Sequence, residues 1–198
     1  MPETVVRRGV ANIEVMTSRQ YNKICLAVDN LRDLCLIQLG METGRRAGEM
    51  EHFTISGIDW DEGEIHCYDI KKKNWVWVGI SSKLQGDLKR YINTAKLKTL
   101  LFPGRREGRG IGDKQVDLIL KQWAKETGVA DNDKVVITWH CLRRSLVSRA
   151  EDLGISFPEV QHITQDSPQT LLKYYKKVSL SGLGKKLQKL YETSQEEG

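Results

Sequence analysis

Hydrophobic side chains along most of the chain recur every three to four positions, which is the spacing of an amphipathic helix. The clearest case is the segment 115–127, where apolar residues fall at i, i+3, i+4, i+7 and i+8 and Gly128 follows as a helix terminator. The same spacing predicts further helices over residues 17–28, 31–39, 45–53, 84–95, 138–153, 169–178 and 183–191.

Capping residues set the expected ends of these helices. Thr17 or Ser18 precedes the first helical segment, and Thr138 precedes a long one, and each has a side-chain oxygen that can accept a bond from a free backbone N–H. Gly40 and Gly154 follow two of the apolar runs, so we expect them to end those helices.

Three short runs between the helices have strand character. Residues 53–58, 64–70 and 75–80 are rich in β-branched and aromatic side chains, and turns over 61–63 and 71–74 separate them. This pattern predicts a small antiparallel sheet of three strands. The expected fold class is therefore mainly α with a small antiparallel three-stranded β-sheet (α+β).

A chain of 198 residues has the size of one domain with short extensions. Residues 1–16 carry little pattern and are expected to form an N-terminal arm or linker. The main domain is expected over residues 17–178. Residues 179–198 are expected to form a tail helix, whose apolar stripe could pack on the same chain or on a second copy.

Composition places the chain among globular proteins outside the membrane. Hydrophobic residues make up 39% and charged residues 29%, so the chain can bury a core. No apolar run approaches the roughly 18–20 residues that span a bilayer, and the N-terminus has no signal-peptide pattern, so we expect a cytoplasmic protein. The four cysteines are dispersed along the chain, so we expect them to be small buried hydrophobic residues rather than zinc ligands or disulfide partners. They are Cys25, Cys35, Cys67 and Cys141.

The charge is basic and unevenly distributed. Lysine and arginine total 31 against 26 acids, a net charge of +5. The stretch 171–190 holds six lysines and no acid, and a second basic cluster contains Arg105, Arg106 and Arg109. Such clusters suit a polyanion such as nucleic acid. A solvated basic surface explains the same pattern, and the charge alone leaves both interpretations open.

Two arginines stand in positions that suit phosphate chemistry. His140 and Arg143 lie three apart on one predicted helix, which places a proton carrier beside a forked cation. Arg46 follows the expected turn at Thr43 and Gly44. Either feature alone also fits an ordinary helix surface.

Five short segments occur in an informative order. They are Thr43–Glu49 (TGRRAGE), the lysine turn before 77–80 (WVGI), 101–103 (LFP), 138–145 (TWHCLRRS) and 167–175 (SPQTLLKYY). In this order they resemble the motifs of the tyrosine recombinases, the phage integrase family. The resemblance extends from Thr17 to about Val178, so it implies the catalytic domain of that family.

The resemblance implies cleavage and rejoining of DNA strands by a tyrosine nucleophile. Arg46 and Arg143 would hold the scissile phosphate, and Tyr174 would attack it to give a 3′-phosphotyrosine that a second 5′-hydroxyl resolves. The spacing from Thr170 favours Tyr174 over Tyr175. Positive side chains mask the phosphate charge, so no metal or other cofactor is expected.

Further roles follow from the same resemblance. His140 would transfer a proton or contact the phosphate, and Glu49 would orient Arg46. Lys71, seven residues before Val78, would protonate the leaving 5′-oxygen, with Lys72 and Lys73 as alternatives.

One family position departs from the pattern. Gln165 stands nine residues before Tyr174, where the family has histidine, and a different gap placement would put Asp166 there. Glutamine can bond to a phosphate oxygen but cannot carry a proton. His162 is nearby, although a helix-surface role suits it better.

The expected partner is double-stranded DNA. We expect the chain to form a homo-oligomer, a tetramer, on recombination sites and to be a monomer free in solution. Only about 40 residues precede Arg46, where family members carry a DNA-clamping domain, so we expect weak, salt-dependent binding. One alternative function is that of a catalytically weakened DNA-binding module of the same fold. Another is relaxation of supercoiled DNA, as by a type IB topoisomerase. A nucleoid-associated protein of viral or plasmid origin would fit. The side chains assigned to DNA contact are Lys72, Lys73, Arg105, Arg106, Arg109, Arg144, Lys173, Lys176 and Lys177.

Overall fold

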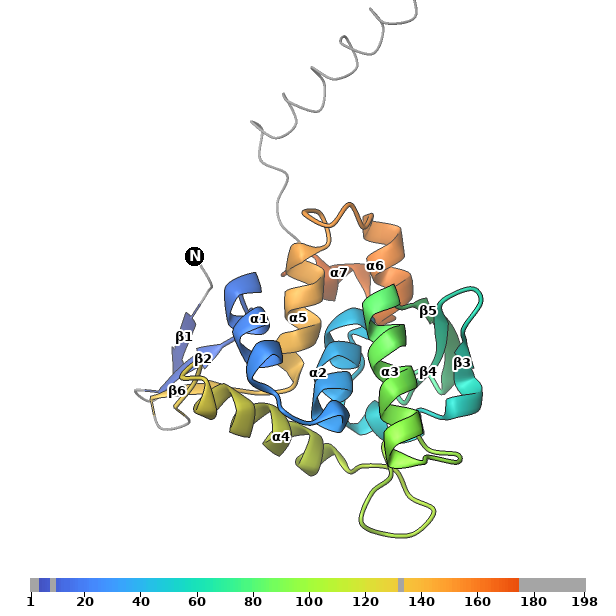
Figure 1. The fold of residues 1–198 in the computed structure, drawn as a ribbon. Coiled ribbons are helices and arrows are strands. Elements are labelled where there is room, and N and C mark those ends of the chain that lie inside the picture. Colours follow the sequence, from blue (N-terminus) through green and yellow to red (C-terminus); the bar gives the residue numbers. More distant parts are fainter. Residues whose placement is uncertain (1–3, 8–9, 132–133, 175–198) are drawn as a thin grey trace, which may run out of the picture.

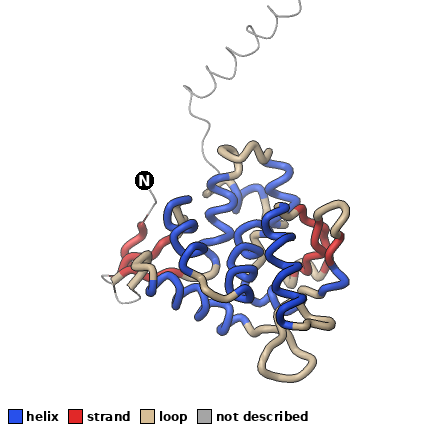
Figure 2. Tube along the Cα trace, in the orientation of Figure 1, coloured by secondary structure: helices blue, strands red, loops and turns tan. Residues whose placement is uncertain are grey.

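The computed structural model describes residues 4–7, 10–131 and 134–174. A body of helices occupies the middle of the molecule, and two small sheets lie at opposite sides of it (Figures 1 and 2). The predicted tail 179–198, together with Tyr175, Lys176 and Lys177, lies outside the described residues.

The helical body is built around α2 (Leu31–Thr43), which is buried along most of its length. It packs against α1 (Ser18–Ala27), α3 (Ser82–Ala95), α4 (Asp113–Glu126) and α5 (His140–Arg149). Figure 1 shows α2 in the centre of these helices. The remaining helical elements are α6 (Phe157–Thr164), α7 (Pro168–Leu171) and the two 3-10 helices η1 (Ala47–His52) and η2 (Ile55–Gly57).

The predicted three-stranded antiparallel sheet is confirmed, in the order β3-β4-β5. Its strands are β3 (Ile58–Asp59), β4 (Glu64–Asp69) and β5 (Asn74–Gly79). The strand predicted over 53–58 is wrong except for its last residue, because Ile55–Gly57 form η2. The Ile55 N–H and the Phe53 carbonyl pair instead with the backbone at 99–101.

A second sheet, in the order β1-β2-β6, was not predicted. β1 (Thr4–Arg7) and β2 (Val10–Ile13) pair antiparallel within the segment expected to be an arm, and β2 pairs parallel with β6 (Val135–Ile137). Because β6 leads into α5, this pairing ties the N-terminal segment to the start of that helix (Figure 1).

Three expected helix boundaries are wrong. α2 runs through Gly40 and ends at Gly44, which is left-handed with φ of 59°. Gly40 is an interior glycine because a Cβ there would lie 2.3 Å from the Trp139 ring. Thr138 makes no capping bond, since α5 begins at His140 without a side-chain cap, and α5 ends at Arg149 before a series of turns.

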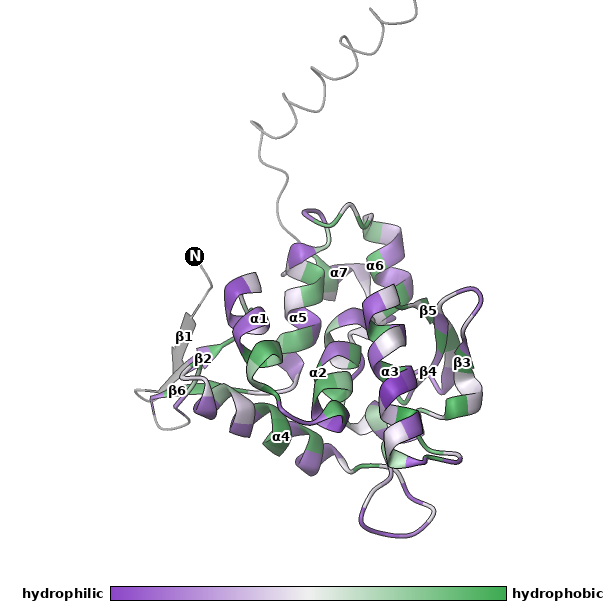
Figure 3. Ribbon diagram, in the orientation of Figure 1, coloured by the Kyte–Doolittle hydropathy of each residue, from purple (hydrophilic) through white to green (hydrophobic). Residues whose placement is uncertain are grey.

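The buried apolar residues form one main core cluster, and hydrophobic and hydrophilic residues alternate along the helices of the ribbon in Figure 3. The predicted stripe on α4 is buried, and Thr17 caps α1 with a capping box to Gln20. One pair of buried polar groups joins α4 to α2, through the bond from Trp123 Nε1 to Asp33 Oδ2 of 2.9 Å. Within the described ranges, no helix has the length and apolar character needed to cross a membrane.

Candidate active site

Arg46 is held by the carboxylate of Glu49. The left-handed Gly44 ends α2 and turns the chain, so that Arg46 stands at the start of η1. Glu49 is buried and accepts from the Arg46 backbone N–H and from Arg46 Nη1, each at 2.8 Å. A buried carboxylate bonded at two points fixes the direction of the guanidinium.

A second carboxylate, Asp69, connects Arg46 to the lysine turn. Asp69 Oδ2 lies 3.3 Å from Arg46 Nη1, and Asp69 Oδ1 accepts from the Lys72 backbone N–H at 2.7 Å. Burial opposes ionisation of Asp69, but these donors outweigh it and lower the pKa of its carboxyl. Burial also opposes the charge of Arg46, but the carboxylates of Glu49, Asp69 and Asp166 together outweigh it and raise the Arg46 pKa. Both groups are therefore charged at neutral pH.

Arg143 is buried on α5 and ties two helix ends together. Its Nη1 donates to the Gly44 carbonyl at 2.7 Å, and its Nη2 donates to the carbonyl of Thr164, the last residue of α6. Carbonyls at a helix C-terminus have no partner within the helix, so the guanidinium satisfies them.

Arg45, which sequence reasoning missed, has a related structural role. Arg45 is completely buried and donates to the carbonyls of Thr43 and Ile163. Burial is the main cause that lowers the pKa of its guanidinium. Nothing in the local sequence distinguishes it from the exposed arginine that normally follows a helix end.

Arg46 and Arg143 meet at one carboxylate, that of Asp166. Arg46 Nη2 lies 3.2 Å from Asp166 Oδ1, and Arg143 Nη2 lies 2.7 Å from the same oxygen. Arg143 Nε donates to Asp166 Oδ2 at 2.9 Å. Two guanidiniums from distant parts of the sequence therefore converge on a single small anion, which is the arrangement that a phosphate-binding site requires.

An open cleft of about 400 Å³ lies beside this cluster. Its walls come from η1, the first turns of α4 and the start of α5. They are formed by Arg46, Ala47, Asp113, Lys114, Asp117, Thr138, Trp139 and His140. The α4 residues in this wall were not predicted, because only the packing of α4 against η1 brings them there.

His140 shares the cleft with Arg46, as the resemblance implies. Partial burial, followed by the neighbouring guanidiniums of Arg144 and Arg143, lowers the His140 pKa, and Asp166 opposes this. The imidazole is therefore neutral at pH 7 and able to accept a proton.

Lys72 is the lysine of the turn that contacts the site. Its Nζ donates to Gln165 Oε1 at 3.3 Å, and Gln165 Nε2 donates to the His162 carbonyl at 2.7 Å. Gln165 is left-handed with φ of 60° and directly precedes Asp166. Lys71 and Lys73 are exposed at the tip of the turn.

Tyr174 lies at the end of the described chain. Its ring packs against a small apolar cluster that includes Val147 and Leu171, and the Arg144 guanidinium lies 5.0 Å from the ring centre. Arg144 also pairs with Glu14 at 3.3 Å. Among the contacts of the described residues, none joins Tyr174 to Arg46 or Arg143.

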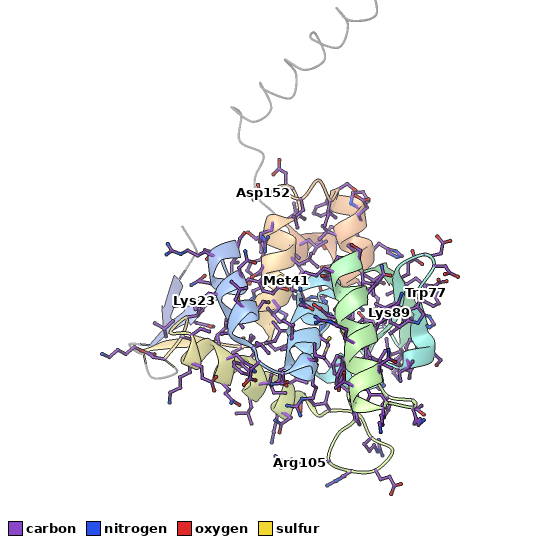
Figure 4. All side chains as sticks on the ribbon, in the orientation of Figure 1. Lys23, Met41, Trp77, Lys89, Arg105 and Asp152 are labelled. Carbon is purple, nitrogen blue, oxygen red and sulfur yellow. The ribbon has the colours of Figure 1, made fainter. Side chains whose placement is uncertain are left out.

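The predicted DNA-contacting arginines 105, 106 and 109 lie on an exposed loop between α3 and α4, where Figure 4 labels Arg105. The base of this loop packs on η1, because a Cβ at Gly110 would lie 2.2 Å from the Glu51 carbonyl oxygen. The loop therefore starts beside the element that carries Arg46. Lys173 is exposed near Tyr174.

In the part of the chain that the structure describes, no three histidine, cysteine or acidic side chains are grouped as metal ligands. The four cysteines are free.

Comparison with known proteins finds that a family model described as the phage integrase family matches residues 14–180. The tyrosine recombinase XerC of Thermodesulfovibrio yellowstonii is 26% identical over 176 residues, which cover 84% of this chain and 56% of that protein. XerC of Roseiflexus castenholzii is 25% identical over 144 residues, covering 68% of this chain and 44% of that protein. The chain thus spans about half the length of these relatives.

Solved structures share the fold. The crystal structure of XerA recombinase superposes with a TM-score of 0.69 at 19% identity, covering 88% of this chain and 64% of that one. A lambda integrase dimer bound to a COC' core site superposes with a TM-score of 0.66 at 20% identity, covering 90% of this chain and 65% of that one. The expected fold class, mainly helical with a small three-stranded antiparallel sheet, is confirmed.

Proposed function

The chain belongs to the phage integrase family, and we propose that it cleaves and rejoins DNA strands through a 3′-phosphotyrosine intermediate on Tyr174. The observation that carries this proposal is the convergence of Arg46 and Arg143 on one carboxylate. The two non-bridging oxygens of a phosphodiester share one negative charge, as the two carboxylate oxygens do, and can accept from the same two forked donors.

The proposed reaction begins at the phenol. A tyrosine with a pKa of roughly 10 is a weak nucleophile at pH 7, so a neutral His140 takes the phenol proton as the oxygen attacks phosphorus. Arg46 and Arg143 stabilise the negative charge that grows on the non-bridging oxygens. The bond from phosphorus to the 5′-oxygen breaks and the strand remains attached to Tyr174 through its 3′-phosphate. A 5′-hydroxyl of another strand reverses these steps and reseals the DNA.

The leaving 5′-oxygen needs a proton, and the turn after β4 supplies the lysine. The resemblance points to Lys71, whereas the contact of Lys72 with Gln165 favours Lys72. Asp69 holds the backbone of this turn against Arg46, so the proton donor and the phosphate-binding arginine are positioned together.

A suicide substrate tests the proposal directly. This is duplex DNA with a nick just beyond the scissile phosphate, so that the short 5′-product diffuses away and the covalent complex accumulates. We expect an adduct that resists denaturant and is lost in Tyr174→Phe. Tyr175→Phe is the matched control and keeps the adduct. Loss of the adduct in Tyr175→Phe alone would move the nucleophile to Tyr175, and no adduct with the native chain would refute cleavage.

A DNA-binding module that does not cut is the second candidate. Gln165, which cannot carry a proton, is the observation that favours it. Such a module would bind the same duplex with salt-dependent affinity and give no covalent complex.

The partner and assembly belong to the same proposal. Double-stranded DNA is the proposed substrate, and the lambda integrase structure on its core site supports this choice. We propose that several copies, a tetramer, assemble on a recombination site. A DNA substrate would place the protein at the nucleoid, in the cytoplasm.

A further inference from the structure

The donors available to a bound phosphate are already occupied by Asp166. Arg46 directs Nη1 at Glu49 and Asp69, which leaves Nη2 for an external anion. Arg143 uses Nη1 on the Gly44 carbonyl and one N–H of Nη2 on the Thr164 carbonyl, which leaves Nε and the second N–H of Nη2. Asp166 contacts all three of these remaining nitrogens, between 2.7 and 3.2 Å.

The local charges balance only when Asp166 is counted. The guanidiniums of Arg45, Arg46 and Arg143 face the carboxylates of Glu49, Asp69 and Asp166, so the cluster has a formal charge of zero. Without the Asp166 carboxylate it carries one positive charge. A phosphodiester carries one negative charge and restores the balance.

Asp166 is also the carboxylate best placed to leave. Its side chain is 16% exposed, whereas those of Glu49 and Asp69 are 0% and 1% exposed. It lies in the short connection between α6 and α7, and its backbone N–H makes only a long bond of 3.4 Å to Thr164 Oγ1. Rotation of this side chain into solvent would bury no charge and would break no helix.

We propose that Asp166 is an internal competitor for the phosphate site, which fills the Arg46–Arg143 pair in the DNA-free protein and withdraws when a scissile phosphodiester binds. This inference rests on the proposed function, since it concerns the same site. Asp166 keeps two buried or half-buried guanidiniums paired without DNA, and each binding event must displace it. Removal of its charge should therefore strengthen phosphate binding.

The opposite role is that of a positioning residue. If Asp166 instead held the arginines in their working geometry while phosphate bound beside it, loss of its charge would weaken phosphate binding and slow cleavage. The two roles predict changes of opposite sign, so one substitution separates them.

The test compares Asp166→Asn with the native chain. Asparagine keeps the size and one acceptor oxygen but loses the charge. Asp61→Asn is the matched control, because it makes the same change in the exposed turn before β4. Asp166→Ser, which is too short to reach both guanidiniums, is a second variant in case the first does not fold.

Two readouts are needed. One is the rate of adduct formation on the nicked duplex at subsaturating DNA. The other is the rise in melting temperature on adding inorganic phosphate, with chloride at equal ionic strength as the reference, since a ligand that binds the native state stabilises it. We expect Asp166→Asn to speed adduct formation about tenfold, as for loss of a charged hydrogen-bonded competitor, and to enlarge the phosphate-induced rise.

The outcomes separate the two proposals. If the native chain forms adduct but either readout is unchanged or reduced in both Asp166 variants, the competitor role is overturned. The proposed function is then retained. An equal gain in Asp61→Asn also overturns it, since the effect would then be one of overall charge. No adduct with any variant, but a larger phosphate effect in Asp166→Asn, refutes the proposed function and retains the competitor role.

Discussion

Gly40 is the position where a single added carbon should disturb the site from a distance. It lies within α2 against the Trp139 ring, and a Cβ there would be 2.3 Å from Cζ2 and 2.8 Å from Cη2 of that ring. Contacts between carbon atoms are normally near 3.5–4 Å. The Trp139 ring is buried and its Nε1 donates to the Arg45 carbonyl at 3.0 Å, so it cannot shift freely.

Gly40→Ala is therefore expected to destabilise the protein by about 2 kcal/mol. Overpacking of a core costs about 1–3 kcal/mol, and the better helix propensity of alanine returns up to about 1 kcal/mol. The net loss of stability therefore lies between about 0 and 3 kcal/mol. The contact of 2.3 Å is severe, so we expect a loss in the upper half of this range. For a domain of this length, 1 kcal/mol shifts the melting temperature by roughly 2–4 °C, so a decrease of about 4–8 °C is expected.

Gly86→Ala is the matched control for this measurement. Gly86 lies within α3, and a Cβ there would meet no atom within 4 Å. The same substitution should stabilise the protein by about 0.5–1 kcal/mol, because alanine restricts the unfolded chain. Urea unfolding followed by circular dichroism measures both variants, as a shift in midpoint at constant slope. If Gly40→Ala gained stability as Gly86→Ala does, Trp139 would not pack against α2 as described.

Two further predictions concern proton transfer. Lys72→Ala should slow adduct formation more than Lys71→Ala does. A substrate with sulfur in place of the leaving 5′-oxygen should restore the rate of Lys72→Ala, since a thiolate leaves without a proton. If Lys71→Ala were the slower variant, Lys71 would be the proton donor. Because burial and two guanidiniums lower the His140 pKa below its usual 6.5, the rate of adduct formation should hold as the pH falls to about 6.5 and decline only below that. A decline that begins above pH 7, or one that persists in His140→Asn, would contradict this role for the imidazole. The same lowered pKa means that the unfolded chain binds the proton first, so His140 reduces stability only as the pH falls below about 6.5.

The order of the motifs was readable without coordinates because each motif is a local spacing. Thr17 caps α1 through a residue three positions away, and the apolar stripe of α4 is a repeat within one helix. The hairpin of β4 and β5 is likewise marked by alternation and a lysine turn. Arg46 and Arg143 were identified in the same way, from motifs that each occupy fewer than ten residues.

The errors lie where a residue's role depends on a distant segment. Gly40 was expected to end a helix, and only the Trp139 ring explains why glycine stands inside α2. The strand predicted before Ile58 was lost because its backbone pairs with residues 99–101 instead. The sheet of β1, β2 and β6 went unrecognised, since β6, which pairs with β2, is more than a hundred positions away.

By itself, the sequence determined the family and the mainly helical class, and it predicted the two arginines, since short-range patterns encode capping, periodicity and turn chemistry. Only the tertiary structure decided which charges meet. Asp166 stands between Arg46 and Arg143, and Arg45 is buried, because the C-terminal ends of α2 and α6 meet at Arg143 of α5. The electrostatics of a site depend on distances across the fold, and no local spacing specifies those distances.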